Sequence, residues 1–560
     1  MTLLERGPSR RFLLLHLLPL LASIGIGVGF AIAKGQDLNF DLLNYHFYDP
    51  WAFLHGRSFS NLDFAPAQMQ TFFNPLVDVP AYLLMTHTSP MAVGAILGAW
   101  QGLNLWLIYE IGLVAIPHVF QGRLLVPLTA FFVAALSFFG ANNSAEIGGT
   151  MDDNTTSVLV LAALWLLLRR WDATSRPGIS ARELSPRRRA RVVASRCAPF
   201  ALVGLAVALK PTNAPFAVAL LAVDVIETLC GASARIGSRA LAAIRSAGLR
   251  LVALAAGFCV AASYWAWQLW VHYQNPFFPL FNNVFHSSYV LPVSAVDARF
   301  FPRNLGQWLF YPFYFLRVQN LPDEVDFRDA RLAAIYAMAV LVLAYAVVRR
   351  LWRGRWQGPP QSLRILLIFA AVSYLLWETV YSVYRYTISL EFLALLIVTL
   401  SLGYIVTRRA AIVVAAVCVS VAIALSTVPC DFGRLPWQGS SFGVQVPDAS
   451  LTAPATVLMI GTDPDGFLVP YLPSETDVIR VQSGLTEIMS PKFTKLMNNL
   501  VVVQRSSGRN FYVLMSVADA ASAPDVVGQF GFSVGSCKPV VTFAQPWPGY
   551  YETCILTEGH

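Results

Sequence analysis

Long apolar stretches recur along most of this chain, and they limit what it can fold into. An α-helix needs about 20 residues to cross roughly 30 Å of bilayer hydrocarbon. Runs of that kind lie near residues 12–33, 91–116, 124–141, 155–170, 251–271, 330–348, 365–382, 387–407 and 410–428. A further apolar stretch, 198–229, is interrupted by Lys210 and Pro211, which indicates two shorter helices joined by a turn. The sequence therefore predicts a polytopic α-helical membrane protein with about eleven transmembrane helices.

Composition excludes a soluble globular protein. Of the 560 residues, 56% are hydrophobic and 13% are charged, whereas charged residues make up about 25% of a typical soluble domain. The formal net charge is +8, but the arginines that produce it lie mainly in short stretches between the apolar runs. Such a distribution is typical of membrane proteins and does not indicate binding to nucleic acid.

The basic stretches also predict which side each loop faces, because Lys and Arg in short loops stay on the cytoplasmic side. With the N-terminus inside, one face receives Arg6, Arg10, Arg11, Arg123, Arg408, Arg409 and the stretches 169–196, 235–250 and 349–364. The opposite face receives the loops 34–75, 142–154 and 272–329 and the tail after about residue 429. We therefore expect these three loops and the C-terminal region outside the cytoplasm.

The last part of the chain, 429–560, lacks such apolar runs and predicts a separate domain after a transmembrane domain at 1–428. Short β-branched segments predict strands at 456–461, 477–482, 500–504 and 511–515, and the stretch 485–499 predicts a helix. This pattern indicates a small α/β domain outside the cytoplasm. Cys537 and Cys554 either form a disulfide across the final hairpin or remain buried free thiols.

Gly25, Gly27 and Gly29 form a glycine repeat inside the first apolar run. A nucleotide-binding glycine loop follows a β-strand, and no strand is predicted before this run. Small residues also let membrane helices approach one another closely. We therefore expect these glycines to serve helix packing.

The first outer loop holds the most informative acid. The segment Asp37-Leu-Asn-Phe-Asp41-Leu-Leu-Asn-Tyr45-His46 follows directly on the first apolar run. On a helix, Asp41 and Tyr45 are four residues apart and share a face, so a carboxylate and a phenol would point into one cavity. The alternative is a solvated acid that caps an interfacial helix.

The second outer loop, 142–154, contains Glu146 and the adjacent acids Asp152 and Asp153. Carboxylates in this arrangement are suited to hold a divalent cation or to orient an acceptor hydroxyl. Asp is also a common N-cap, so the other interpretation is that Asp152 or Asp153 simply caps the helix that follows. The sequence leaves both interpretations open.

Two cations lie at predicted outer boundaries. Lys210 ends an apolar run, where an ammonium group is placed to meet a phosphate; its alternative role is snorkelling to the outer headgroups. Arg385 is the basic residue on the turn between two late apolar runs. Aromatic neighbours such as Tyr386 would shield it from water and strengthen its attraction for an anion. An ion pair with Glu378 or Glu391 is the rival interpretation.

Taken in order, these features resemble the GT-C superfamily of membrane glycosyltransferases, over about residues 1–428. The segment from Asp41 to Tyr45 is similar to the Asp-Glu-x-x-Tyr or His pattern of its aminoarabinose-transferase and protein-mannosyltransferase-like branch. Leu42 stands where that pattern has its second acid, so Asp41 alone carries over as the catalytic candidate. Arg385-Tyr386 is similar to the late Arg-Tyr of the family.

The resemblance implies an inverting glycosyltransferase that takes its sugar from a polyprenyl phosphate on the outer face of a bacterial inner (cytoplasmic) membrane. Asp41 would be the general base on the acceptor hydroxyl, while Lys210 and Arg385 would stabilise the departing lipid phosphate. The other candidate substrate-binding residues are Tyr45, His46, Glu146, Asp152, Asp153 and Tyr386, and Asp152 with Asp153 could hold a divalent cation. The implied partners are membrane lipid, the polyprenyl-phosphate-linked sugar, and a glycan, lipid or protein acceptor.

A multi-pass transporter or flippase of a lipid-linked or anionic substrate is the alternative, since it would use the same intramembrane charges. Transporters usually show internal repeats with helix breaks at matching positions in two halves. The break at Lys210-Pro211 has no second copy in the sequence. The sequence therefore favours the glycosyltransferase.

Overall fold

The computed structural model describes residues 12–174, 186–230, 236–294, 297–354, 358–406, 408–445 and 451–559. The chain divides into two compact units, and each is discontinuous in sequence. The helical unit comprises 1–34, 94–261 and 297–432, and the sheet unit comprises 35–93, 262–296 and 433–560. The basic residues Arg6, Arg10 and Arg11, the stretch 175–185 and Arg235, used above to predict orientation, lie outside the described residues.

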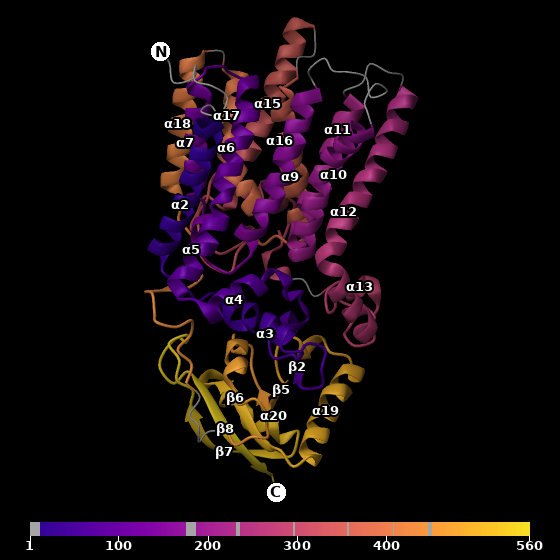
Figure 1. The fold of residues 1–560 in the computed structure, drawn as a ribbon, viewed down its shortest axis with the longest axis vertical. Helices are drawn as coiled ribbons and strands as arrows, with labels where there is room; N and C mark the ends of the chain where they lie inside the picture. The colour runs from indigo at the N-terminus through magenta and orange to yellow at the C-terminus, as the bar shows by residue number, and fades with distance from the viewer. Residues whose placement is uncertain are drawn as a thin grey trace. The chain divides into compact units, whose positions relative to one another are not determined.

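The helical unit is built from long helices that run alongside one another (Figure 1). They are α2 (Leu18–Lys34, preceded by a π-helical turn at Leu13–Leu17), α6 (Leu103–Ala115), α7 (Leu125–Ser137), α9 (Asp153–Thr174), α10 (Pro186–Leu209), α11 (Ala214–Cys230), α15 (Arg331–Arg353), α16 (Gln361–Val380), α17 (Ile388–Ile405) and α18 (Arg409–Ser426), with the shorter α8 (Asn143–Glu146) and α14 (Leu305–Tyr314). Two further helices, α5 (Pro90–Gln101) and α12 (Ile236–Tyr273), begin in one unit and end in the other.

Eight helices in the described residues are long and apolar enough to cross a membrane, and two shorter ones, at Leu125–Ser137 and Ala410–Ser426, are also apolar. A helix in hydrocarbon satisfies its own backbone hydrogen bonds, so apolar runs of this length become helices. The remaining predicted run lies on α9, which carries charged residues at both ends. Each predicted run therefore falls on a helix, and the prediction of a polytopic helical membrane protein is confirmed.

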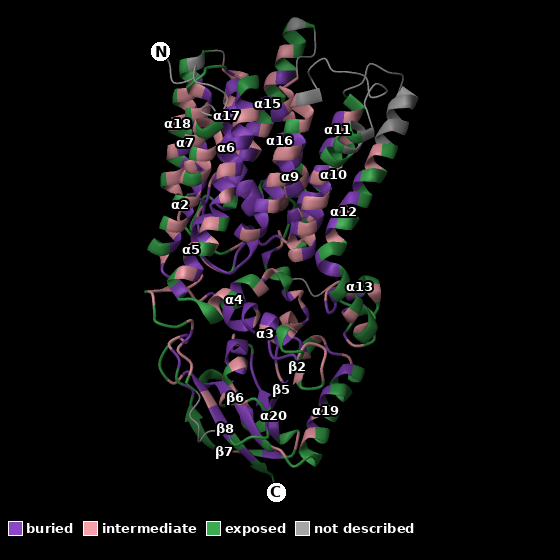
Figure 2. Cartoon of the chain, in the orientation of Figure 1, coloured by how far each residue is buried: buried purple, intermediate pink, exposed green. Residues whose placement is uncertain are grey.

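Helix α17 lies in the interior of the helical unit (Figure 2). Every residue from Ile388 to Ser401 is buried, and the helix packs against α7, α15 and α18. A helix that is apolar all round is buried on all sides, which explains why α17 has no polar face. A carboxylate on this helix, such as Glu391, is therefore held inside the unit.

Of the three glycines in the first apolar run, Gly27 lies at a close helix contact. A Cβ atom at Gly27 would come within 2.1 Å of the Gly98 carbonyl oxygen, so only glycine fits there. A Cβ atom at Gly25 or Gly29 would meet no atom within 4 Å among the described residues. The packing prediction therefore holds for Gly27 and not for its two neighbours.

The sheet unit contains a six-stranded mixed sheet of order β2-β5-β4-β6-β8-β7. Its strands are β2 (Asp63–Phe64), β4 (Ala455–Met459), β5 (Thr476–Arg480), β6 (Asn510–Ser516), β7 (Phe532–Pro539) and β8 (Tyr551–Glu558). The pairs among β2, β5, β4 and β6 are parallel, and β8 pairs antiparallel with β6 and β7. Helices α3 (Tyr48–Leu54), α4 (Val79–His87), α13 (Asn282–Phe285), α19 (Pro491–Ser506) and α20 (Ala523–Gly528) and a two-stranded pair of β1 (Gln36–Asp37) with β3 (Arg434–Leu435) complete the unit.

The α/β character of the C-terminal region is confirmed, but its extent and one strand are not as predicted. The contiguous division at residue 428 is incomplete, because 35–93 and 262–296 belong to the same unit as the C-terminal sheet. Strand β2 comes from the first outer loop and pairs with β5. The linear pattern of composition cannot reveal such a pairing.

The segment 500–504 lies in helix α19 and not in a strand. Its β-branched residues suggested a strand, but Phe493, Met497 and Val501 recur every four residues and bury one face of a helix that Ser490 caps. Helical periodicity over the whole segment therefore outweighs the local strand propensity. Cys537 and Cys554 form a disulfide between β7 and β8, which is the first of the two alternatives left open above.

Candidate functional site

The second outer loop is fixed in the helical unit by two carboxylates that come from distant parts of the chain. The two oxygens of Glu391, on α17, accept hydrogen bonds from the backbone N–H groups of Asn142, at 3.1 Å, and Asn143, at 2.8 Å. Asp329 Oδ2 accepts another from the N–H of Ala141, at 2.9 Å. The loop from Ala141 to Asn154 is buried throughout. Its conformation is therefore set by internal hydrogen bonds and not by solvent.

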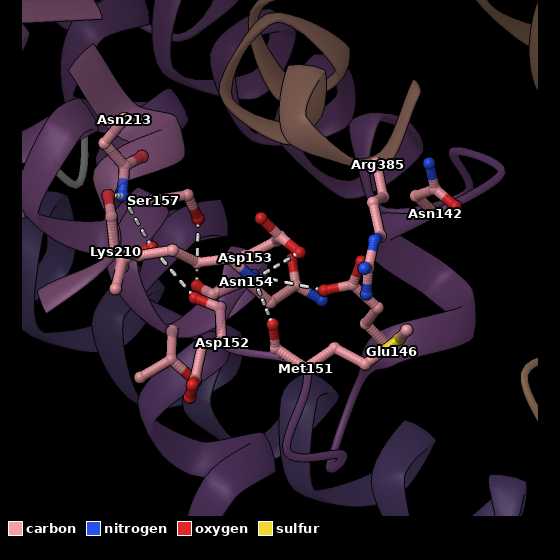
Figure 3. Close-up of polar contacts among 12 residues, drawn as sticks. Asn142, Glu146, Met151, Asp152, Asp153, Asn154, Ser157, Lys210, Asn213 and Arg385 are labelled. Atoms are coloured by element: carbon pink, nitrogen blue, oxygen red, sulfur yellow. Dashed lines mark hydrogen bonds and ion pairs between the residues drawn. The ribbon is translucent and has the colours of Figure 1, made fainter. Parts of the chain in front are cut away.

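Lys210 is joined to this loop. Its side chain reaches from the end of α10, and Nζ donates to Asp153 Oδ2 at 2.7 Å and to the carbonyl oxygen of Met151 (Figure 3). The side chains of Lys210 and Asp153 are only 13% and 5% exposed. Asn213, just after the Lys-Pro break, donates to Thr156 Oγ1 at 3.0 Å. The ammonium group of Lys210 is therefore bound by partners inside the protein.

Glu146 lies beside these groups at the end of α8. Its Oε2 atom accepts a hydrogen bond from the N–H of Asn154 at 3.3 Å, and the residue is 2% exposed. Burial raises the pKa of the Glu146 carboxyl well above its ordinary value, and Asp153 raises it further; Lys210 and Arg385 act in the opposite direction. The structure therefore brings together two carboxylates and two cations that the sequence predicted separately.

Arg385 stands on a 3-10 turn, Tyr384–Thr387, immediately before α17. Its Nη2 lies 3.2 Å from Glu324 Oε1, and its guanidinium carbon is 5.3 Å from the centre of the Tyr386 ring. Lys210 Nζ lies 5.9 Å from the same ring, so Tyr386 neighbours both cations. Of the rival partners predicted from the sequence, Glu391 instead binds the loop amides. Arg385 forms an ion pair with Glu324, which the sequence did not indicate.

Asp152 occupies an uncommon backbone conformation at the start of α9. Its φ angle is +66°, a left-handed value that Asp tolerates better than most residues. Its carbonyl oxygen accepts hydrogen bonds from the N–H of Thr156, at 2.8 Å, and from the Thr156 hydroxyl, also at 2.8 Å. Asp152 therefore starts the helix, while the carboxylate of Asp153 is bound by Lys210.

Asp41, Tyr45 and His46 belong to the sheet unit, whereas the other predicted site residues belong to the helical unit. Asp41 is 8% exposed and directly precedes a π-helical turn at Leu42–His46, so Asp41 and Tyr45 lie about one turn apart as predicted. Asn39 Oδ1 accepts the N–H of Leu42 at 2.8 Å and so caps this turn. The sequence therefore predicted the local helical geometry of this segment.

His46 has a buried acidic partner that sequence reasoning missed. His46 Nδ1 lies 2.5 Å from Asp78 Oδ1, and both side chains are 3% exposed. Burial, and next the charge of Asp78, raise the pKa of the neighbouring Asp49 carboxyl well above its ordinary value. No sequence motif links residue 46 to residue 78, so only the fold shows this pair.

The raised pKa of Glu146 leads to a prediction about pH. An acid with a raised pKa binds its proton more tightly when the protein is folded, so stability falls as pH rises above the unfolded value of about 4.3. We expect the thermal unfolding midpoint of the wild type to fall, relative to Glu146→Gln, as pH rises from about 5 to 8. Circular dichroism melts in one detergent at several pH values would measure this difference. Parallel curves for the two proteins would show that Glu146 is ionised throughout the range.

Comparisons with known proteins find likeness in fold only. No protein-family model and no curated protein matches the chain. The structure of arabinofuranosyltransferase AftD from Mycobacteria is similar with a TM-score of 0.44 and 13% identity, over 100% of this chain and 40% of AftD, so the chain spans about two fifths of that protein. ArnT from Cupriavidus metallidurans, solved bound to undecaprenyl phosphate, is similar with a TM-score of 0.43 and 15% identity, over 96% of this chain and 97% of ArnT.

Proposed function

We propose that this protein is an inverting glycosyltransferase that moves a sugar from a polyprenyl phosphate to an envelope acceptor on the outer face of the membrane. The observation that carries the proposal is the buried cluster of Lys210 and Arg385 beside Glu146 and Asp153. Intramembrane and boundary charges are costly and usually functional. Two cations held in place at a water-poor site are what a phosphate leaving group requires.

The reaction breaks the bond between the anomeric carbon and the phosphate oxygen, and the phosphate leaves with the bonding electron pair. The acceptor oxygen forms a new bond to the anomeric carbon from the opposite side, and its proton passes to a general base. Asp41 remains the candidate base by the family resemblance. Lys210 and Arg385 would stabilise the negative charge that develops on the departing lipid phosphate.

A divalent cation at Asp152 and Asp153 fits the site less well. Lys210 Nζ donates to Asp153 Oδ2 at 2.7 Å, so a cation bound there would compete with an ammonium group for the same carboxylate. Asp152 and Asp153 are therefore proposed to position the acceptor and the Lys210 side chain, and no step is assigned to a metal.

The proposed activity can be tested directly with purified protein in detergent. Radiolabelled polyprenyl-phosphate sugars and candidate acceptors would be incubated with the protein, and the products separated to detect a new glycoside. We expect labelled glycoside and free polyprenyl phosphate in equal amounts. Movement of label across proteoliposomes without a new glycosidic bond would instead support the transporter or flippase and contradict the proposal.

A further inference from the structure

We propose that Glu324 is a resident counter-ion of Arg385 that a phosphate monoester displaces, so that Arg385 is the exchangeable cation of the site. This inference rests on the proposed function for the identity of the ligand, which is the polyprenyl monophosphate that sugar transfer releases, but it concerns how the site binds that ligand. It assigns a role to Glu324, which no feature of the sequence singled out.

The pair is asymmetric in exposure. The side chain of Arg385 is 9% exposed, whereas that of Glu324 is 36% exposed, and Arg385 Nη2 lies 3.2 Å from Glu324 Oε1. Arg385 must keep an anionic partner because an unpaired buried guanidinium is costly. The Glu324 carboxylate can return to water at little cost, since ion pairs with an exposed partner contribute little to stability.

The backbone beneath Glu324 is fixed, so that only its side chain needs to move. The N–H of Glu324 donates to Asp323 Oδ1 at 2.8 Å. Asp323 is 1% exposed, and Asn142 Nδ2 donates to its Oδ2 at 3.2 Å. Cys430 Sγ also lies 3.9 Å from Asp323 Oδ2. The turn is therefore anchored to the second outer loop through Asp323, and Glu324 extends from an anchored position.

Lys210, in contrast to Arg385, is not paired with a carboxylate that can readily be displaced. Its carboxylate partner Asp153 is 5% exposed and lies in the first turn of α9, where the helix dipole stabilises a negative charge. Releasing Asp153 would leave a buried carboxylate without its cation. Lys210 is therefore expected to keep Asp153 as its partner and to act on the phosphate through the electrostatic field of its charge. Arg385, by contrast, changes partner.

A ligand that displaces Glu324 from Arg385 is favoured by a larger negative charge. A phosphate monoester carries up to two negative charges and can accept two parallel N–H bonds from a guanidinium group, so it competes well with a single carboxylate. A phosphodiester carries one charge and a polyprenol carries none. The site should therefore prefer a polyprenyl monophosphate over phospholipids of the surrounding bilayer.

The test is binding of polyprenyl monophosphate to the purified full-length protein, with Glu324→Gln, Arg385→Ala and a matched control. Asp326→Asn is that control, because Asp326 is an exposed acid two residues further along the same turn. We expect Glu324→Gln to bind the lipid phosphate about two- to fivefold more tightly than the wild type. Arg385→Ala should bind it about 10- to 100-fold more weakly, and Asp326→Asn should resemble the wild type.

Competition measurements distinguish free phosphate from phospholipid headgroups as ligands, and kinetic measurements distinguish an effect on binding from an effect on structure. Inorganic phosphate and vesicles of anionic diester phospholipid would serve as competitors, and we expect only the former to compete. The sugar donor is itself a phosphodiester, and transfer releases the monoester, polyprenyl phosphate. In the transfer assay, Glu324→Gln should therefore lower the inhibition constant of this product and leave kcat within about twofold. Lower kcat with an unchanged inhibition constant would indicate a merely structural role for Glu324.

Different results would contradict the exchange at Arg385 and the glycosyltransferase activity. Equal affinities of wild type and Glu324→Gln, with weaker binding by Arg385→Ala, would overturn the exchange and leave the glycosyltransferase in place. Tighter binding by Glu324→Gln without any glycoside product would support the exchange and contradict the transferase. An equal gain in affinity for Asp326→Asn would show that loss of any nearby negative charge strengthens binding, and it would also overturn the exchange.

Discussion

Replacing Asp41 by asparagine is expected to abolish sugar transfer, with a loss of about 10²- to 10⁴-fold in kcat. The amide has nearly the same shape as the carboxylate but cannot accept the proton of the acceptor hydroxyl at neutral pH. Asp41 is 8% exposed and directly precedes the turn Leu42–His46, whose first N–H is capped by Asn39 and not by Asp41. The change should therefore leave folding intact, which the transfer assay and a thermal melt of the same sample would show together.

The matched control is Asp37→Asn, which makes the same change four residues earlier on the same loop. Asp37 accepts hydrogen bonds from the backbone and side chain of Asn39, at 3.4 and 2.8 Å, so its role is local structure. We expect this variant to keep transfer within a few-fold of the wild type. Full transfer by Asp41→Asn would remove Asp41 from the mechanism, and equal losses in both variants would point to misfolding of the loop.

Replacing Asp329 by asparagine is expected to have the largest effect on stability, about 3–5 kcal/mol. Asp329 Oδ2 lies 2.8 Å from Arg331 Nη1, and both side chains are 0% exposed. The same oxygen accepts the N–H of Ala141. The amide would leave the guanidinium of Arg331 without its anionic partner inside the protein. Chemical unfolding in mixed micelles, followed by tryptophan fluorescence, would measure the shift in midpoint.

The double variant Asp329→Asn with Arg331→Met tests that explanation. A buried ion pair replaced by uncharged residues is often close to neutral, because the cost of desolvating both charges disappears with their attraction. We expect the double variant to recover a large part of the lost stability. A double variant that is less stable than Asp329→Asn would show that Arg331 contributes mainly through its bonds to Thr427 and Leu136.

The transmembrane helices could be predicted because their cause is local. An apolar run of sufficient length forms a helix in hydrocarbon whatever it packs against. The strand predicted at 500–504 was wrong because a window of five residues missed the four-residue spacing of Phe493, Met497 and Val501. The division of the chain was incomplete because strand β2 joins the C-terminal sheet from near residue 63. Pairing at that separation leaves no trace in composition.

For the candidate site too, the sequence indicated single residues but not their distant partners. Lys210 and Arg385 could be singled out because basic residues are rare in their surroundings, and Glu146 and Asp153 because they lie on a short loop between two apolar runs. Their partners could not, because hydrogen bonds such as that from Asn142 to Glu391 join residues 249 positions apart. Glu324 and Asp329 lie in a loop with several acids, and nothing local distinguishes them. Only the fold shows which acid meets which cation.

The attachment of the second outer loop to Glu391 also sets an order of events during synthesis. The N–H groups of Asn142 and Asn143 find their carboxylate only when α17 has been made and inserted. At roughly 5–20 residues per second, the ribosome needs about 12–50 s to cover that distance. Until then the loop that carries Glu146, Asp152 and Asp153 lacks its anchor. A nascent chain released before α17 should therefore expose this loop to proteases, however well its earlier helices are inserted.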